Sequence, residues 1–90
     1  MNVISKYQLE MWVDSQTITV PSNAKILHVS EDVGKLSLWL MFDEIGADYF
    51  EDRTFFIIPP EQHFNENGMY FVQTVITKDG FVFNVFEFSK

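Results

Sequence analysis

Five acidic residues lie close together in the middle of the chain, where they could bind a cation or exchange protons. They are Asp43, Glu44, Asp48, Glu51 and Asp52. A calcium loop needs oxygen ligands at fixed positions around a central glycine, closed by a glutamate, and these residues do not keep that spacing. Runs of charge are usually solvated. We therefore predict an acidic surface. A calcium site, a carboxylate pair for acid–base catalysis and mimicry of DNA phosphates remain alternatives.

The two histidines are the only imidazoles in the chain. With Glu31 or Glu61 they could form a metal site of two histidines and one carboxylate, but nothing in their spacing requires one. His28 stands between two apolar residues of an expected strand, so we expect it to have a hydrogen-bonded structural role. His63 lies in an expected loop over 60–68, where binding residues are more common, and it is a ligand candidate. We predict no metal and no other cofactor.

Arg53 is the only arginine, so the chain cannot build the clamp of several arginines that phosphate groups favour. We expect it to form an ion pair with Glu51, Asp52 or an acid on a neighbouring strand. Trp12, Trp39 and Tyr70 could form a stacking platform for a base or nucleotide, although aromatic residues at strand spacing are more often in a core or an interface. Arg53 and Trp39 join His63 as ligand candidates.

The composition limits the class of protein. The chain has 90 residues, with 13 Asp or Glu against 6 Lys or Arg, a net charge of -7 and no cysteine. This length fits a single domain over residues 1–90. The missing cysteines exclude a disulfide scaffold and thiol catalysis, and the acid excess opposes direct nucleic-acid binding. No nucleophile elbow, phosphate-binding glycine loop or H-E-x-x-H motif is present, so we predict that the domain is not an enzyme.

No targeting or membrane segment is visible. The first residues lack the basic stretch and long apolar run of a signal peptide. The longest apolar run, Leu38 to Phe42, is far too short for a membrane helix. We expect a cytoplasmic protein without a membrane partner.

Apolar and polar residues alternate along most of the chain, which predicts β-strands. The strand pattern covers 7–13, 17–20, 26–29, 36–42, 54–58, 69–77 and 81–88. The last two segments flank an Asp-Gly turn, a strong hairpin signal. We predict an all-β fold of six to seven strands, a small antiparallel sandwich or partly open barrel, with one short helical turn near 44–52.

The C-terminal strand is apolar on both faces. Phe81, Phe83 and Val85 share one face, and Phe86 and Phe88 share the other. Such a strand must lie inside a sheet or under a partner, because an exposed apolar edge invites aggregation. These five residues are our candidate interface. The alternative is that the strand is a central one in a two-layer core.

Read as a whole, the chain resembles a family of short proteins from tailed phages and bacterial prophages, for which we know of no established function. Order and spacing agree over most of the sequence. The matching segments are Lys6-Tyr7, Gln16–Ile18 with Pro21, Ala24–Val29, Leu38–Asp43, Glu51–Phe55 and Phe81–Glu87. The resemblance implies a phage origin and a shared β fold, and it implies no reaction.

The chain departs from that family in three places. Family members tend to carry a glycine-containing segment ending in histidine where this chain has 59–63, and often a histidine where it has Asn84. Near Trp12 it holds one extra residue. A family site built from that glycine segment and those histidines would therefore be altered here.

Two classes of function follow. The first is a small phage-encoded domain that binds a host protein, such as an antiviral defence component, and modulates or inhibits it in the infected cell. Its apolar strands also permit a homodimer. The second is a small-ligand binder that sequesters a signalling nucleotide, and a virion accessory protein is a further alternative.

Overall fold

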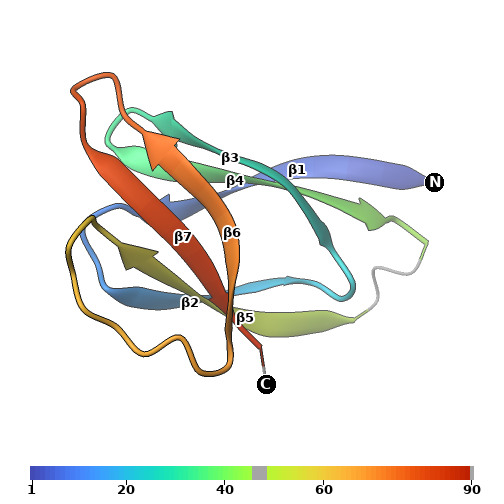
Figure 1. Cartoon of the computed structure of the whole chain (residues 1–90). Coiled ribbons are helices and arrows are strands. Elements are labelled where there is room, and N and C mark those ends of the chain that lie inside the picture. Colours follow the sequence, from blue (N-terminus) through green and yellow to red (C-terminus); the bar gives the residue numbers. More distant parts are fainter. Residues whose placement is uncertain (46–48, 90) are drawn as a thin grey trace.

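The computed structural model describes residues 1–45 and 49–89, and within them it contains seven strands and no helix (Figure 1). The strands are β1 (Asn2–Glu10), β2 (Ser15–Pro21), β3 (Lys25–Asp32), β4 (Lys35–Asp43), β5 (Phe50–Ile58), β6 (Met69–Ile76) and β7 (Val82–Phe88). The predicted all-β fold is confirmed.

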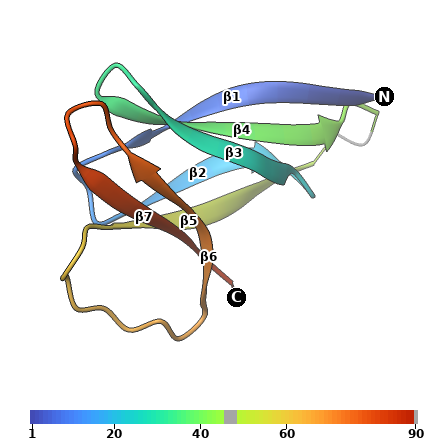
Figure 2. The same ribbon diagram turned by 45° about the horizontal axis from the view of Figure 1, so that its top comes forward.

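The strands form two antiparallel sheets that face each other as two layers (Figure 2). The first sheet has the order β1-β4-β3, and the second has the order β2-β5-β7-β6. The chain crosses between the layers after β1, β2 and β4, so neighbours in sequence are often on opposite sheets. The two sheets stay separate, and of the two predicted architectures the structure is therefore the sandwich.

The core lies between the inner faces of the two sheets. Alternate residues of β4 point inward, and Leu36, Leu38 and Leu40 are almost wholly buried because β4 is flanked by β1 and β3. The opposite sheet supplies Phe55 from β5 and Phe83 from β7. Apolar side chains spaced two apart on central strands thus account for most of the burial.

The helical turn expected near 44–52 is not found in the described residues. Residues 50–52 belong to β5, which pairs with β2 from Pro21 opposite Phe50 onward. Residues 46–48 lie outside the described ranges. Residues 50–52 form a strand because they pair antiparallel with β2. β2 is distant in the sequence, so local sequence patterns could not predict this pairing.

Two glutamines join the edges of the two sheets. The amide of Gln73 on β6 accepts a hydrogen bond from the Val29 N–H at 2.8 Å and donates one to the Val29 carbonyl at 2.6 Å. On the other side Gln16 of β2 makes the same pair of bonds with the backbone of Glu10 on β1, at 2.7 and 2.9 Å. Each glutamine side chain forms the pair of hydrogen bonds that a peptide group of a neighbouring strand would form. It thereby gives hydrogen-bond partners to backbone groups at the edge of a sheet.

Replacing Gln73 with alanine should lower the free energy of unfolding by about 2 kcal/mol, because it leaves partly buried backbone groups of Val29 without partners. Urea denaturation measures this, and hydrogen exchange should show faster exchange of the Val29 amide. Gln16→Ala is the matched control: its contacts are exposed, water can replace them, and the cost should be smaller. Unchanged exchange at Val29 would contradict the role of Gln73.

Candidate functional site

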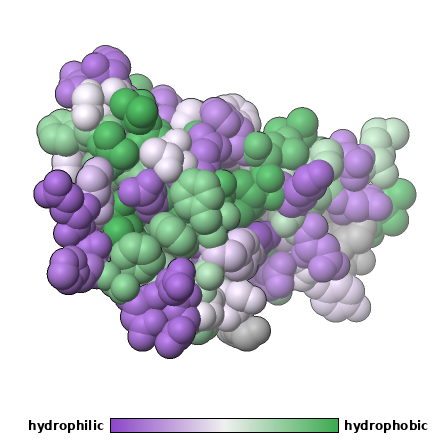
Figure 3. Space-filling model, in the orientation of Figure 1, coloured by the Kyte–Doolittle hydropathy of each residue, from purple (hydrophilic) through white to green (hydrophobic). Residues whose placement is uncertain are grey.

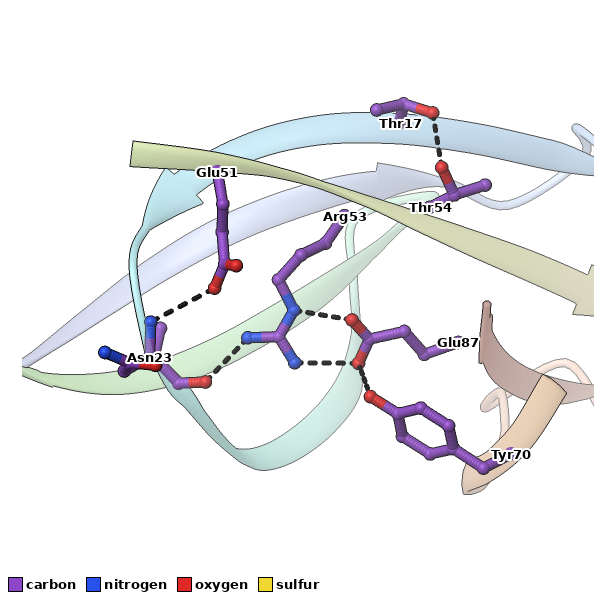
Figure 4. Close-up of polar contacts among 8 residues, drawn as sticks. Thr17, Asn23, Glu51, Arg53, Thr54, Tyr70 and Glu87 are labelled. Atoms are coloured by element: carbon purple, nitrogen blue, oxygen red, sulfur yellow. Dashed lines mark hydrogen bonds and ion pairs between the residues drawn. The ribbon is translucent and has the colours of Figure 1, made fainter. Parts of the chain in front are cut away.

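A buried ion pair links the two central strands of the larger sheet (Figure 4). Glu87 of β7 lies opposite Phe55 of β5 and Tyr70 of β6. Arg53 donates from Nε to Glu87 Oε2 at 2.5 Å and from Nη2 to Oε1 at 2.7 Å. The Tyr70 hydroxyl donates to the same Oε1 at 2.6 Å, and Arg53 Nη1 donates to the carbonyl of Ala24 at 2.6 Å.

Electrostatics within this network favour one protonation state of Arg53 and one of Tyr70. The side chains of Arg53 and Glu87 are only 15% and 4% exposed. The hydrogen bond to Glu87 is the largest influence on Arg53 and raises the pKa of its guanidinium. Burial, followed by the hydrogen bond to Glu87, raises the pKa of the Tyr70 hydroxyl. Arg53 stays charged and Tyr70 neutral, and the arginine is occupied by protein partners.

Arg53 is a ligand candidate from sequence, with Glu51, Asp52 or an acid on a neighbouring strand as its expected partner, and the structure shows the last of these. Sequence reasoning did not single out Glu87, and it assigned Tyr70 to a stacking platform and not to this network. A signal was present, because Glu87 is two residues beyond Val85 and so continues the inward face of Phe83 and Val85. A buried carboxylate needs a base, and the chain has one arginine.

A cavity of about 400 Å³ opens beside this ion pair. It is lined by Glu51, Asp52, Arg53, Thr54, Tyr70, Glu87 and Phe88. Its lining holds three carboxylates and one guanidinium, and that guanidinium is already bound to one of the carboxylates. Such a surface favours a cationic group and opposes a phosphate or nucleotide.

Of the five residues in the candidate interface on the C-terminal strand, some lie in the core and others at the surface. β7 is a central strand between β5 and β6, which agrees with the alternative drawn from sequence. Phe83 is 2% exposed and Val85 is wholly buried, so neither can contact a partner. Phe81, Phe86 and Phe88 reach the surface, and for them the interface remains a prediction.

The outward residues of β7 belong to a larger group of rings, here called the aromatic face. It consists of Phe56, Phe64, Phe71, Phe86 and Phe88. Phe86 is central, with ring centroids 5.2 Å from Phe64 and 5.5 Å from Phe71. Phe64 comes from the connection between β5 and β6, so the loop supplies one ring to the sheet. Figure 3 shows hydrophobic side chains over the region of β6 and β7, with hydrophilic ones around them.

Phe81 lies apart from the aromatic face, in the turn before β7. Its ring packs edge-on against Trp12 with centroids 5.1 Å apart, and Trp12 also meets Phe83 at 5.0 Å. A cavity of about 70 Å³ beside them is too small for more than a few waters. These rings close one end of the core.

A family model described as a domain of unknown function (DUF7352) matches residues 1–90. The chain belongs to the DUF7352 family. No curated protein and no solved structure matches it. The matched span covers both sheets, so the aromatic face and the acidic cavity are parts of the DUF7352 domain.

The acidic residues predicted from sequence do not form one site in the described part of the DUF7352 domain. Asp43, at the end of β4, receives the N-terminal amine at 3.2 Å and the Ile45 N–H. Glu51 accepts from the Asn23 N–H, Glu44 is exposed, and Asp48 lies outside the described residues. Among residues 1–45 and 49–89, no three histidine or acidic side chains are placed to hold a metal ion.

Trp39 and the histidines stand on other surfaces of the domain. Trp39 is on the outer face of β4, with the Lys6 ammonium 5.8 Å from its ring centroid. Lys6 also pairs with Asp32 at 2.9 Å, and that hydrogen bond lowers the pKa of the Asp32 carboxyl. His28 on β3 and His63 in the loop are both exposed. His28 lies on the edge strand of the smaller sheet, and the hydrogen-bonded structural role expected for it is not found among the described residues.

Asn84 ties three strands of the DUF7352 domain together. It accepts from the Thr74 hydroxyl at 2.7 Å and donates to the Ile58 carbonyl at 3.1 Å. No described helix is long and apolar enough to cross a membrane.

Proposed function

We propose that this domain binds another protein through its aromatic face. The observation that carries the proposal is the exposure of rings over the outer face of the larger sheet: Phe71, Phe64 and Phe88 are 56%, 46% and 42% exposed. With about 200 Å² for each phenylalanine, these three alone present on the order of 300 Å² of apolar surface. Exposed apolar patches often mark an interaction site, and aromatic residues are enriched at the centres of protein interfaces.

The charged residues around the larger sheet indicate what kind of partner protein the aromatic face would bind. Five exposed acids surround the larger sheet, against a single exposed base in that part of the described chain, Lys78. The acids are Glu51, Asp52, Glu61, Glu66 and Asp79. A second copy would bring the same acids to the rim and be repelled, whereas a partner with basic residues around an apolar patch would be attracted. We therefore favour a different protein over a homodimer.

The resemblance to phage and prophage proteins supports a more specific form of the proposal. In that form the domain is phage-encoded, and the partner is a host protein, such as an antiviral defence component, that the domain modulates or inhibits. A nucleotide-binding role is less well supported, because the 400 Å³ cavity is lined by three acids and its arginine is already paired.

The test compares two single variants that each remove one exposed apolar side chain from a strand. Phe71→Ser alters the aromatic face, and Ile4→Ser alters the other sheet at a similar exposure. Tagged domain is incubated with host lysate, and a photo-crosslinker at position 74, beside Phe71 on the outer face, marks direct contacts. We expect one partner to be captured by wild type and Ile4→Ser and lost, by about tenfold or more, in Phe71→Ser.

Light scattering on the same samples separates the alternatives. Capture that is equal in both variants, or no crosslinked partner at all, contradicts the proposal. Self-association that disappears in Phe71→Ser would assign the face to a homodimer instead.

A further inference from the structure

The outer end of β5 has a strand on one side only. β2 pairs with β5 from Phe50 to Phe56, but β7 pairs with it only from Phe55 to Ile58. Because Phe55 pairs with Glu87, Thr54 lies opposite Phe88 at the end of β7. Over Phe50–Arg53, therefore, no other strand of the described chain lies along the second side. Figure 1 shows β5 continuing past the C-terminal end of β7.

The backbone groups of this free edge can be assigned from the alternation of the strand. Ile57 donates its N–H to the Asp14 carbonyl, at 3.0 Å, on the β2 side. In an antiparallel strand the N–H and C=O of alternate residues point to opposite sides. Phe50 and Asp52 are an odd number of residues from Ile57, so they direct their backbone groups away from β2, on the part of β5 that β7 does not reach. An extended segment could pair with them there.

The 400 Å³ cavity lies along this edge. Four of its lining residues are consecutive, 51–54, and consecutive strand residues point to opposite faces of a sheet. A cavity that touches all four must run beside the strand and not over one face. Tyr70 and Phe88 close the end where β7 stops.

Charge selects what can occupy the edge. Glu51 and Asp52 flank it on the two faces and are exposed, while Arg53 is held by Glu87. Glu51 accepts a hydrogen bond from the Asn23 N–H, and Asp52 accepts one from the Thr19 hydroxyl. A second copy pairing antiparallel about Asp52 would set Asp52 opposite its own copy, and a register shift of two residues would do the same with Glu51. Like charges directly opposite each other destabilise a sheet. Acidic residues at this edge therefore disfavour pairing with a second copy and favour pairing with a basic segment.

We propose that the free edge of β5 binds an extended, lysine- or arginine-containing peptide segment, which adds to the larger sheet as a strand in line with β7. Main-chain hydrogen bonds to β5 supply part of the affinity, and pairing with Glu51 or Asp52 supplies selectivity. This proposal does not depend on the aromatic face, because the edge and the cavity would be present if that face bound nothing.

The test uses a fluorescein-labelled heptapeptide of alternating lysine and valine, whose register can place lysines on the face of Asp52 or, one residue shifted, on that of Glu51. Fluorescence anisotropy at about 0.15 M salt should give a Kd on the order of 100 μM. A peptide of the same sequence with every second amide N-methylated keeps its charge and loses half its donors. It should bind about tenfold more weakly if strand addition is correct.

Two double variants with equal charge change locate the site. Glu51→Gln with Asp52→Asn should weaken binding about tenfold, since two attractive pairs are lost. Glu61→Gln with Glu66→Gln, in the loop away from the cavity, should change it less than about twofold. Both changes keep the side-chain shape, and circular dichroism confirms the fold. Phe71→Ser should bind the peptide like wild type. The peptide result can therefore be interpreted even if the aromatic face binds no partner protein.

Three results would overturn the proposal. They are no binding at millimolar peptide, equal binding of the N-methylated peptide, or equal losses in the two double variants. Either of the last two results would mean that the peptide binds through the net negative charge of the domain and not by pairing with the edge of β5.

Discussion

Replacing Glu87 with alanine should lower the free energy of unfolding by about 3 kcal/mol, within the range for breaking a buried ion pair. The substitution removes the acceptor of two hydrogen bonds from Arg53 and one from Tyr70. Arg53 then stays charged in a nearly buried position, with the Ala24 carbonyl as its one remaining partner. We place the loss at the low end because the arginine side chain retains some contact with water. Urea denaturation measures it.

The matched control removes both charges at once. Arg53→Met with Glu87→Leu leaves no unpaired charge and keeps apolar volume between β5 and β7, so it should recover much of the lost stability. An alanine variant within about 1 kcal/mol of wild type would show that water compensates Arg53 and that the ion pair does not hold the strands. The ion pair of Arg53 and Glu87 would then need a role other than stabilising the fold.

Replacing Phe83 with alanine should cost about 4 kcal/mol, the magnitude expected for a large cavity in a core. Phe83 is almost wholly buried, stands on a central strand and packs against Trp12. Its ring fills the space between the sheets, and the neighbouring strands cannot collapse into it without losing their pairing. The loss would be a large part of the stability of a domain of this size.

Phe71→Ala is the control, since this ring sits more than half exposed on the outer face of an edge strand. It should cost less than about 1 kcal/mol, while the same change weakens binding of a partner at the aromatic face. Equal losses of stability in the two variants would contradict the division of the C-terminal phenylalanines into core and surface.

Much of the fold could be predicted from local patterns. Leu36, Leu38 and Leu40 are spaced two apart and identify the inner face of β4, and the Asp-Gly turn identifies the hairpin of β6 and β7. The helical turn near 44–52 could not be excluded in this way, because the strand over 50–52 depends on its pairing with β2. His28 shows the same limit: its place between two apolar residues favoured a hydrogen-bonded structural role, but its strand is an edge and its side chain is exposed.

The candidate site could be predicted only in part. The C-terminal strand was predicted to be apolar on both faces and to carry a candidate interface of five residues, but alternation alone does not say which face meets the other sheet. The acidic residues were seen as one group along the chain. In space Asp43 lies at the end of β4, whereas Glu51 and Asp52 line a cavity with Tyr70.

By itself the sequence determined that this protein is a small, acidic, all-β domain, because strand periodicity and composition are local properties. Only the tertiary structure decided which strands are central, which edge stays free and which acid Arg53 meets. Arg53 and Glu87 are 34 residues apart, and their contact depends on the register of β5 against β7. Register is a property of two distant segments packed together, and a shift of one residue would turn Glu87 to the outer face.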